Sequence, residues 1–345
     1  MCLKVAVIGA GSMGTNHLRV LRDFPEEQVH LVGVAEAYGP VLQRAVRRFH
    51  VDGYADYRQM IEQTRPDLVT LAVPTYLHYE VAVCALELGC NVLIEKPMAE
   101  DTTQACRLIE LARARNVKIA VGHVERFNPA IIEMKRRLQT GDLGRIFHIY
   151  ARRLGPFPPR IRDVGVTLDL ATHDIDVMHH LLDAEVVHVY AEMQRHIHEA
   201  YEDLLLGVLR FSNQVIGVLD INWLTPTKVR ELSITGEGGM YQVNYLTQDL
   251  YFYANDYSPT NWDALRSFTG VSEGTMTRLK VQKAEPLRLE YEDVLAALRD
   301  DVLPTVTGED GLAALRVALR LSEASQLAGF SCALESMAVK VKSEV

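Results

Sequence analysis

A lysine placed directly after an apolar segment is the first residue of this chain whose position suggests chemistry. Lys96 stands near the end of the run from Asn91 to Met98, whose apolar residues are typical of a buried strand. In an open parallel α/β sheet, ligands bind in the crevice beyond the carboxyl ends of the strands, so the Lys96 ammonium is expected to face a ligand. Lysine is costly to bury, and burial shifts its pKa. The alternative is a surface lysine at the start of a loop.

A histidine and an aspartate four positions apart form a second candidate. Asp169 and His173 would lie on one face if their segment is helical. Histidine is a common general base, and a carboxylate beside it can orient the imidazole and raise its basicity. The nearby Asp174 and Asp176 are expected to cap a helix or to be solvated. A purely structural role for the pair is the alternative, because this spacing alone is not specific for catalysis.

A glycine-rich loop follows the first apolar segment and opens a helical pattern. Glycines at this spacing allow a tight turn, let the backbone approach a pyrophosphate and permit close helix packing, while the helix amino terminus favours the phosphates. Glu36, at the end of the next expected strand, can accept hydrogen bonds from a ribose and would repel a 2′-phosphate, which favours NAD over NADP. The residues predicted to bind the cofactor here are Gly9, Gly11, Ser12, Met13, Gly14 and Glu36.

A third segment, Val73 to His78, follows another expected strand and should reach the same edge of the sheet. Pro74 is explained by turn chemistry alone. His78 is expected either to cap or pack a helix or to touch the cofactor. Pro74, Thr75 and His78 are therefore added to the predicted cofactor contacts.

The elements that must position these residues alternate between strand and helix in the first third of the chain. Expected strands are Lys4–Ile8, Val29–Ala35, Leu68–Ala72, Cys90–Ile94 and Lys118–Val121. Expected helices are Gly14–Phe24, Val41–Phe49, Glu80–Leu88 and Thr102–Asn116. Such alternation predicts a parallel sheet covered on both faces.

After Val121 the pattern changes to long alternating runs that predict one antiparallel sheet. The expected strands are Ile146–Arg153, Val186–Gln194, Leu204–Phe211, Val215–Trp223, Arg230–Thr235 and Gly239–Asn244. The expected helices are Pro129–Gln139, Glu292–Leu303 and Gly311–Ala328. The predicted fold class is α/β, with a doubly wound Rossmann sheet in residues 1–122 and an α+β domain on a large open, mostly antiparallel sheet in residues 123–345.

Composition limits the partners. The 345 residues carry a net charge of -9, which argues against nucleic acid or an anionic membrane surface and favours a small molecule. The five cysteines form no CxxC pair, so neither a disulfide framework nor a thiolate metal site is expected, and no metal is predicted. Reduced thiols, the lack of a signal-peptide pattern after Met1 and the lack of a membrane-length apolar run predict a cytoplasmic protein.

Taken together, the motifs resemble those of the Gfo/Idh/MocA oxidoreductases over nearly the whole chain. The motifs that carry the resemblance are Gly9-x-Gly11-x-x-Gly14, Pro74-Thr75-x-x-His78, Glu95-Lys96-Pro97, Gly122-His-Val-Glu-Arg-Phe-Asn-Pro129 and Asp169-x-x-x-His173. The resemblance implies an NAD(P)-dependent dehydrogenase acting on CH–OH groups, with Glu95, Lys96 and Pro97 beside the cofactor. It also implies a homodimer or homotetramer formed through the open sheet of the second domain.

The resemblance further implies catalytic roles. Lys96 would hydrogen-bond the reacting hydroxyl, His173 would be the general base, and Asp169 would contact the substrate or support His173. All three are also predicted substrate-binding residues. Arg126 and Asn128, from the same motifs, are predicted to bind it as well.

The substrate is inferred from a cluster of arginines in an otherwise acidic chain. Arginine forks suit phosphate or carboxylate, as in a nucleotide sugar. The stretch from Gly122 to Asp176 resembles that of family members which oxidise C3 of UDP-N-acetylglucosamine. The cluster comprises Arg152, Arg153, Arg160 and Arg162, of which Arg153, Arg160 and Arg162 are predicted to bind substrate. The alternative for these arginines is pairing with acidic residues.

The same residues fit alternative functions. The same machinery would serve a free sugar, an inositol or a sugar acid, and a non-catalytic NAD-sensing regulator is the alternative of another class. Lys228 and Arg230 stand at the predicted end of a strand, where a loop or interface role is at least as well supported as substrate contact.

Overall fold

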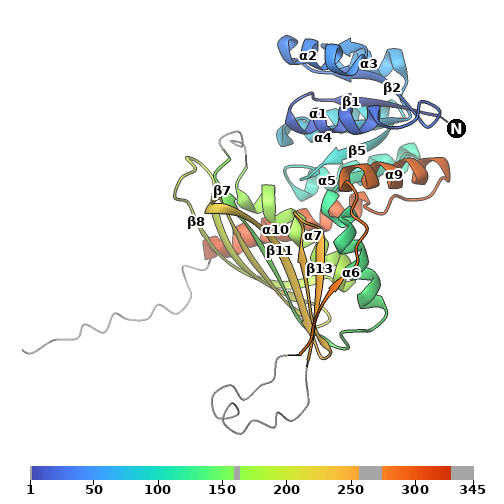
Figure 1. The fold of residues 1–345 in the computed structure, drawn as a ribbon. Helices are drawn as coiled ribbons and strands as arrows, with labels where there is room; N and C mark the ends of the chain where they lie inside the picture. The colour runs from blue at the N-terminus through green and yellow to red at the C-terminus, as the bar shows by residue number, and fades with distance from the viewer. Residues whose placement is uncertain (1, 159–163, 256–273, 328–345) are drawn as a thin grey trace, which may run out of the picture.

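The structure, a computed structural model, describes residues 2–158, 164–255 and 274–327 (Figure 1). Within this part, the chain forms two sheets with their helices. The predicted fold class is confirmed, because a parallel sheet of six strands is followed by a mostly antiparallel sheet of eight. No helix in the described ranges is long and apolar enough to cross a membrane.

The first sheet has the strand order β3-β2-β1-β4-β5-β6, and all its pairs are parallel. Its strands are β1 (Leu3–Ile8), β2 (Val29–Ala35), β3 (Gly53–Tyr54), β4 (Leu68–Leu71), β5 (Asn91–Glu95) and β6 (Ile119–Gly122). Its helices are α1 (Ser12–Arg22), α2 (Gly39–Phe49), α3 (Tyr57–Thr64), α4 (Thr75–Glu87) and α5 (Thr102–Arg115). The order reverses between β1 and β4, where a doubly wound sheet forms its ligand crevice.

Two local predictions in this domain need correction. The helix expected from Glu80 begins at Thr75, directly after Pro74 at its N-cap position. His78 therefore lies inside α4 and does not cap it. The short β3 and α3 were not predicted, although Asp56 caps α3 by accepting a hydrogen bond from the backbone N–H of Arg58.

The second sheet has the strand order β14-β13-β12-β11-β7-β10-β9-β8. Its strands are β7 (Ile146–Pro156), β8 (Val186–Gln194), β9 (Leu204–Phe211), β10 (Ile216–Asn222), β11 (Leu224–Gly236), β12 (Gly239–Asn244), β13 (Asp249–Ala254) and β14 (Met276–Leu279). The pair β7–β10 is parallel, so the sheet is not antiparallel throughout. The reason is the crossover that follows β7, after which β8, β9 and β10 form a meander that returns beside β7.

Helices cover one face of this sheet. The crossover contains η2 (Thr167–Ala171), a π-helical turn, and α7 (Thr172–Leu182); η1 (Val124–Phe127) and α6 (Pro129–Gln139) precede the sheet, and α9 (Pro286–Arg299) and α10 (Gly308–Leu327) follow it. Met178 of α7 and Leu321 of α10 share a buried cluster with Leu209 and Leu219 of the sheet. The other face carries exposed apolar side chains, among them Leu206 and Val208.

The helix α9 crosses back to the first domain, as Figure 1 shows. Its Leu287, Tyr291 and Leu295 are buried in one cluster with Val5 of β1 and Leu18 of α1. Burial of apolar surface is the dominant favourable contribution to such packing. The first core is therefore built from both ends of the chain, while the predicted boundary at residue 122 remains a prediction.

Candidate active site

Two adjoining pockets open where β1, β4 and β5 end. We call the first the glycine pocket, of about 390 Å³, and the second the lysine cleft, of about 420 Å³. They share the wall from Ala72 to Pro74. The glycine pocket is lined by the predicted residues Gly9, Gly11, Glu36 and Pro74. The lysine cleft is lined by the predicted residues Met13, Pro74, Thr75, His78, Glu95, Lys96, Pro97, Arg153, Asp169 and His173.

The three loop glycines meet three different requirements. A Cβ on Gly9, which has φ +93°, would lie 2.4 Å from the carbonyl oxygen of Ala72, and a Cβ on Gly14 would lie 1.9 Å from that of Gly9. A Cβ on Gly11 would meet nothing within 4 Å. The first and third glycines thus permit the turn and the close packing, whereas the space at the second is what a pyrophosphate needs. The residues present fit a dinucleotide.

The amino terminus of α1 supplies donors for the phosphates. Ser12 is its first residue, and no side chain caps this helix at Gly11. The N–H groups of the first turn therefore remain for a ligand, and the helix dipole favours an anion. Glu36 stands across the pocket and accepts hydrogen bonds from the backbone N–H groups of Ala10 and Tyr38, each at 2.9 Å. Each of its oxygens keeps a lone pair for a ribose hydroxyl.

Lys96 pairs with Asp169 in the lysine cleft. Its Nζ donates to the carboxylate Oδ1 of Asp169 at 2.9 Å and to the backbone oxygen of the same residue at 2.6 Å. Both side chains are largely buried. An ammonium has three N–H donors, so one remains for a substrate oxygen.

His173 also faces this cleft, but it does not bond to Asp169. Within the part of the chain that the structure describes, its buried Nδ1 has no hydrogen-bond partner. The carboxylate of Asp169 is directed to Lys96 because a charged ammonium is the stronger partner than a neutral imidazole. The expectation that Asp169 orients His173 is therefore not met in this geometry. Burial, together with the charges of Lys96 and Arg153, lowers the pKa of His173 well below its ordinary value.

Lys96 is flanked by buried polar residues that hold the end of β5. Glu95 accepts a hydrogen bond from Nε2 of His17 at 2.9 Å, and Nδ1 of His17 lies 2.9 Å from the hydroxyl of Tyr291. Burial alone would raise the pKa of Glu95, but the bond from His17 and the charges of His17, Lys96 and His78 together outweigh burial, so the pKa is lowered. On the other side, the ring nitrogens of His78 lie 2.8 Å from the oxygen of Pro97 and 3.0 Å from that of Val73. These contacts fix the backbone on both sides of Lys96.

Arg153 reaches the lysine cleft as an already paired cation. Its Nε donates to Asp174 at 2.6 Å and its Nη1 to Glu125 at 2.9 Å. Burial opposes its charge, but Asp174 and Glu125 more than compensate and raise the pKa of Arg153. Asp174 is 1% exposed, so the expectation of a capping or solvated residue was wrong.

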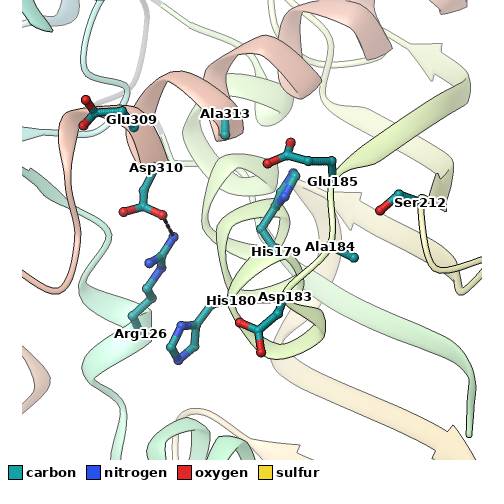
Figure 2. A pocket seen from close by; sticks show the side chains of 10 residues that line it. All are labelled: Arg126, His179, His180, Asp183, Ala184, Glu185, Ser212, Glu309, Asp310 and Ala313. Atoms are coloured by element: carbon teal, nitrogen blue, oxygen red, sulfur yellow. Dashed lines mark hydrogen bonds and ion pairs between the residues drawn. The ribbon is translucent and has the colours of Figure 1, made fainter.

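Arg126 lies outside the lysine cleft. It borders a separate pocket of about 410 Å³, between α7 and α10, where Figure 2 shows its guanidinium pointing to Asp310. It donates to Asp310 at 2.8 Å and to both carboxylate oxygens of Asp176 at 2.7 and 2.6 Å. Asp176 is also 1% exposed, so the expectation that it caps or is solvated was equally wrong. In both cases the arginine partner comes from a distant segment.

The remaining predicted substrate residues are not brought to the cleft. Asn128 is buried, caps α6 through the N–H of Ala130 and donates to the carbonyl oxygen of Tyr245. Arg152 is half-exposed, with Asp220 and Glu231 nearby. Arg160 and Arg162 lie outside the described residues.

The structure adds residues to the cleft that were not predicted there. They are Ala72, Val73, Val124, Val164, Leu170 and Arg230. Arg230 lies within β11, directly opposite Arg153 of β7, and not at the end of a strand as expected. The register of β7 with β11 shifts between Leu224 and Val229. Such pairing between distant strands leaves no local signal in the sequence.

Two family models match the chain. One, described as "Oxidoreductase family, NAD-binding Rossmann fold", matches residues 3–123. The other, described as "GFO/IDH/MocA C-terminal domain", matches residues 131–242. Together they include the glycine loop, Lys96, Asp169 and His173.

Curated relatives match over long stretches. A UDP-N-acetylglucosamine 3-dehydrogenase of Acidithiobacillus ferrooxidans is 26% identical over 320 residues, which cover 91% of this chain and 94% of the relative. An inositol 2-dehydrogenase of Saccharopolyspora erythraea is 31% identical over 231 residues, which cover 64% of this chain and 67% of the relative. The two names point to different substrates.

Solved structures agree with the fold over almost the full length. That of the Acidithiobacillus ferrooxidans UDP-N-acetylglucosamine 3-dehydrogenase superposes with a TM-score of 0.84 at 25% identity and covers 95% of this chain and 98% of its own. The WlbA dehydrogenase of Bordetella pertussis, solved with NADH and UDP-GlcNAcA, gives a TM-score of 0.77 at 21% identity and covers 94% of this chain and 97% of its own. At that identity the second likeness shows the fold alone.

Proposed function

Because this chain belongs to the GFO/IDH/MocA oxidoreductases, we propose that it oxidises a sugar hydroxyl to a ketone with NAD. The proposed substrate is a nucleotide sugar such as UDP-N-acetylglucosamine, which would be oxidised at C3. The observation that carries the proposal is the meeting of Lys96, Asp169 and His173 in a cleft that shares a wall with the glycine pocket. The nucleotide-sugar substrate is supported by the likeness to the Acidithiobacillus enzyme over nearly the full length of both chains.

The chemistry divides among the three residues. Bound NAD supplies the acceptor for the hydride that leaves carbon. His173 takes the hydroxyl proton, and its lowered pKa keeps the imidazole neutral and able to do so at neutral pH. The remaining N–H of Lys96 hydrogen-bonds the reacting oxygen and holds it between ammonium and imidazole. Asp169 acts by fixing Lys96, to which it is bonded at 2.9 Å.

NAD is the proposed cofactor, in preference to NADP. Both oxygens of Glu36 are held at the pocket wall by backbone N–H groups, which fixes the carboxylate where a ribose would lie. A 2′-phosphate there would be repelled by this charge.

A second substrate class is supported by a specific finding. The inositol 2-dehydrogenase of Saccharopolyspora erythraea has the higher identity of the two relatives, 31%, although over a shorter stretch. A free polyol, sugar or sugar acid would use the same three residues. A non-catalytic NAD sensor is disfavoured, because it would have no use for a lysine and a neutral histidine at one cleft.

We also propose a homo-oligomer formed through the open face of the second sheet. Tyr190, Val208, Val218 and Tyr150 form a row across β8, β9, β10 and β7, since each is paired with the next in the register. Tyr190 and Val208 are 46% and 42% exposed. Exposed apolar patches of this kind mark interaction sites, and a second copy of the chain is the proposed partner.

Turnover with the two substrate classes tests the function. We expect wild-type protein to reduce NAD with UDP-N-acetylglucosamine, and the His173→Ala variant to lose turnover by about 10²–10⁴-fold while NAD binding is kept, because only the proton acceptor is removed. NADH formation is followed by absorbance, with NADP and myo-inositol as parallel arms.

The matched control is His30→Ala, an exposed histidine on β2 that should leave turnover unchanged. Turnover of myo-inositol alone would replace the proposed substrate by the second class. Wild-type activity in the His173→Ala variant would remove His173 as the base.

A further inference from the structure

The cations of the lysine cleft are not equally neutralised. Lys96 is bonded to Asp169, and Arg153 is bonded to Asp174 and Glu125. Arg230 lines the same cleft, yet among the described residues no carboxylate forms a salt bridge with it. The acidic groups close enough to affect Arg230 are already bonded to other cations: Asp174 and Glu125 to Arg153, and Asp169 to Lys96.

The position of Arg230 is electrostatically unfavourable. It stands directly opposite Arg153 in the β7–β11 pairing, and like charges at opposed positions destabilise a sheet. Burial, followed by the charge of Arg153, lowers the pKa of Arg230 to about 10. A bound anion in the cleft would relieve both costs, because it would pair with a cation that is already desolvated.

The free edge of the guanidinium has the geometry for such an anion. Nη1 donates to the carbonyl oxygens of Leu154 at 2.5 Å and Val229 at 2.8 Å, which uses both of its hydrogens. The Nε–H and the two Nη2–H donors have no bond to a described residue. This Nε/Nη2 edge is the fork that binds carboxylate or phosphate in a bidentate manner. Residue 155, which lies beside this edge, is a glycine. A Cβ at this position would lie in contact with Nη2 of Arg230, at 3.8 Å.

We propose that Arg230 is the anion-binding residue of the cleft, that its Nε/Nη2 edge takes a phosphate or carboxylate of the substrate, and that it selects charged over uncharged sugars. The inference rests on the proposed function, since it places the substrate beside Lys96 and His173. It also assigns the anion site to a residue on β11, whereas the sequence predicted it among the arginines of the 152–162 segment.

Steady-state kinetics of Arg230→Gln test the proposal. With saturating NAD, we expect KM for the anionic substrate to rise about 10- to 100-fold, as for loss of a charge-assisted bidentate bond, while kcat changes by less than about threefold. Arg230→Lys keeps the charge without the fork and should give an intermediate KM. KM for myo-inositol should not change, because it carries no anion.

The control is Arg195→Gln, which removes one exposed arginine of the loop after β8 and alters the net charge equally. UDP-N-acetylglucosamine tests a phosphate and glucuronate tests a carboxylate. Thermal protection by UDP in the presence of NAD gives a second readout, which should be lost in Arg230→Gln and kept in Arg195→Gln.

The outcomes separate this proposal from the proposed function. If wild type oxidises glucuronate and not the nucleotide sugar, the proposed substrate fails, and a selective KM rise for glucuronate in Arg230→Gln still supports the anion site. An unchanged KM for the anionic substrate, or an equal rise for myo-inositol or in Arg195→Gln, overturns it. Exclusive use of uncharged polyols by wild type overturns it as well, while the His173→Ala experiment continues to test the chemistry.

Discussion

At the scale of single residues, the charge state of His173 is set by its neighbours and not by a carboxylate partner. The imidazole is buried and lies near the positive charges of Lys96, Arg153 and Arg230. Burial and these charges all disfavour its protonated form. The carboxylate that could have raised its pKa is engaged by Lys96. A base of low pKa is a weaker proton acceptor, but it stays unprotonated over a wider range of pH.

This arrangement predicts the acid limb of the pH profile. The base must be neutral, so activity falls as pH drops through the pKa of His173. Because that pKa lies well below the ordinary 6.5 of histidine, kcat/KM should stay level on going from pH 7.5 down to pH 6.5 and decline only at lower pH. Initial rates at subsaturating substrate across this range measure it, and a half-maximal point above pH 6.5 would contradict the electrostatic account.

The wrong or undecided predictions for single residues have one cause in common, which is contact between distant segments. Lys96, Asp169 and His173 were predicted and are brought together: Lys96 directly follows β5, and Asp169 and His173 stand four positions apart in η2 and α7. Asp174 and Asp176 were expected in solvent and are buried, since their arginine partners come from segments that only the tertiary fold brings near. Arg230 was left undecided because its place depends on a shifted register between distant strands.

At the scale of elements, local patterns were sufficient for most of the fold. The bounds of β2, β8, β9, β12 and α6 agree with those predicted, since alternation and helical periodicity are local properties. The parallel pairing of β7 with β10 and the docking of α9 on the first domain could not be predicted, because both depend on contacts between distant segments. The fold class, the family and the dehydrogenase class are confirmed.

The docking of α9 predicts a stability effect at Tyr291. Its buried hydroxyl lies 2.9 Å from Thr70 on β4 and 2.9 Å from His17 on α1, so it joins three elements. Tyr291→Phe should lower the free energy of unfolding by about 1–3 kcal/mol, because two buried polar groups lose a partner. Urea unfolding measures the change, with Tyr76→Phe on the exposed side of α4 as the neutral control. Equal stability of both variants would argue against a structural role for this hydroxyl.

At the scale of the whole molecule, one large face of the second sheet is covered by no helix of the described residues. The opposite face is buried under α7 and α10, whereas the row from Tyr190 to Tyr150 faces outward. Two such faces packed together would bury this row in an isologous interface.

A charge placed in that row should separate the copies. Val208→Asp is expected to convert the wild-type oligomer to a monomer, because a carboxylate buried in an apolar interface has no partner. Light scattering after gel filtration measures the mass, and Arg195→Gln serves as the control. A wild-type monomer, or an unchanged oligomer in Val208→Asp, would exclude this face as the interface.

The contribution of α9 to the first core also has a consequence for how the protein is made. A ribosome releases the chain from its amino terminus, and domains ordinarily fold in that order. Here Leu287 and Leu295, which share a buried cluster with Val5 and Leu18, are synthesised long after the six strands of the first sheet. A nascent chain that has emerged only as far as β6 therefore keeps an apolar surface exposed until translation is nearly complete, and exposed apolar surface of this kind favours aggregation.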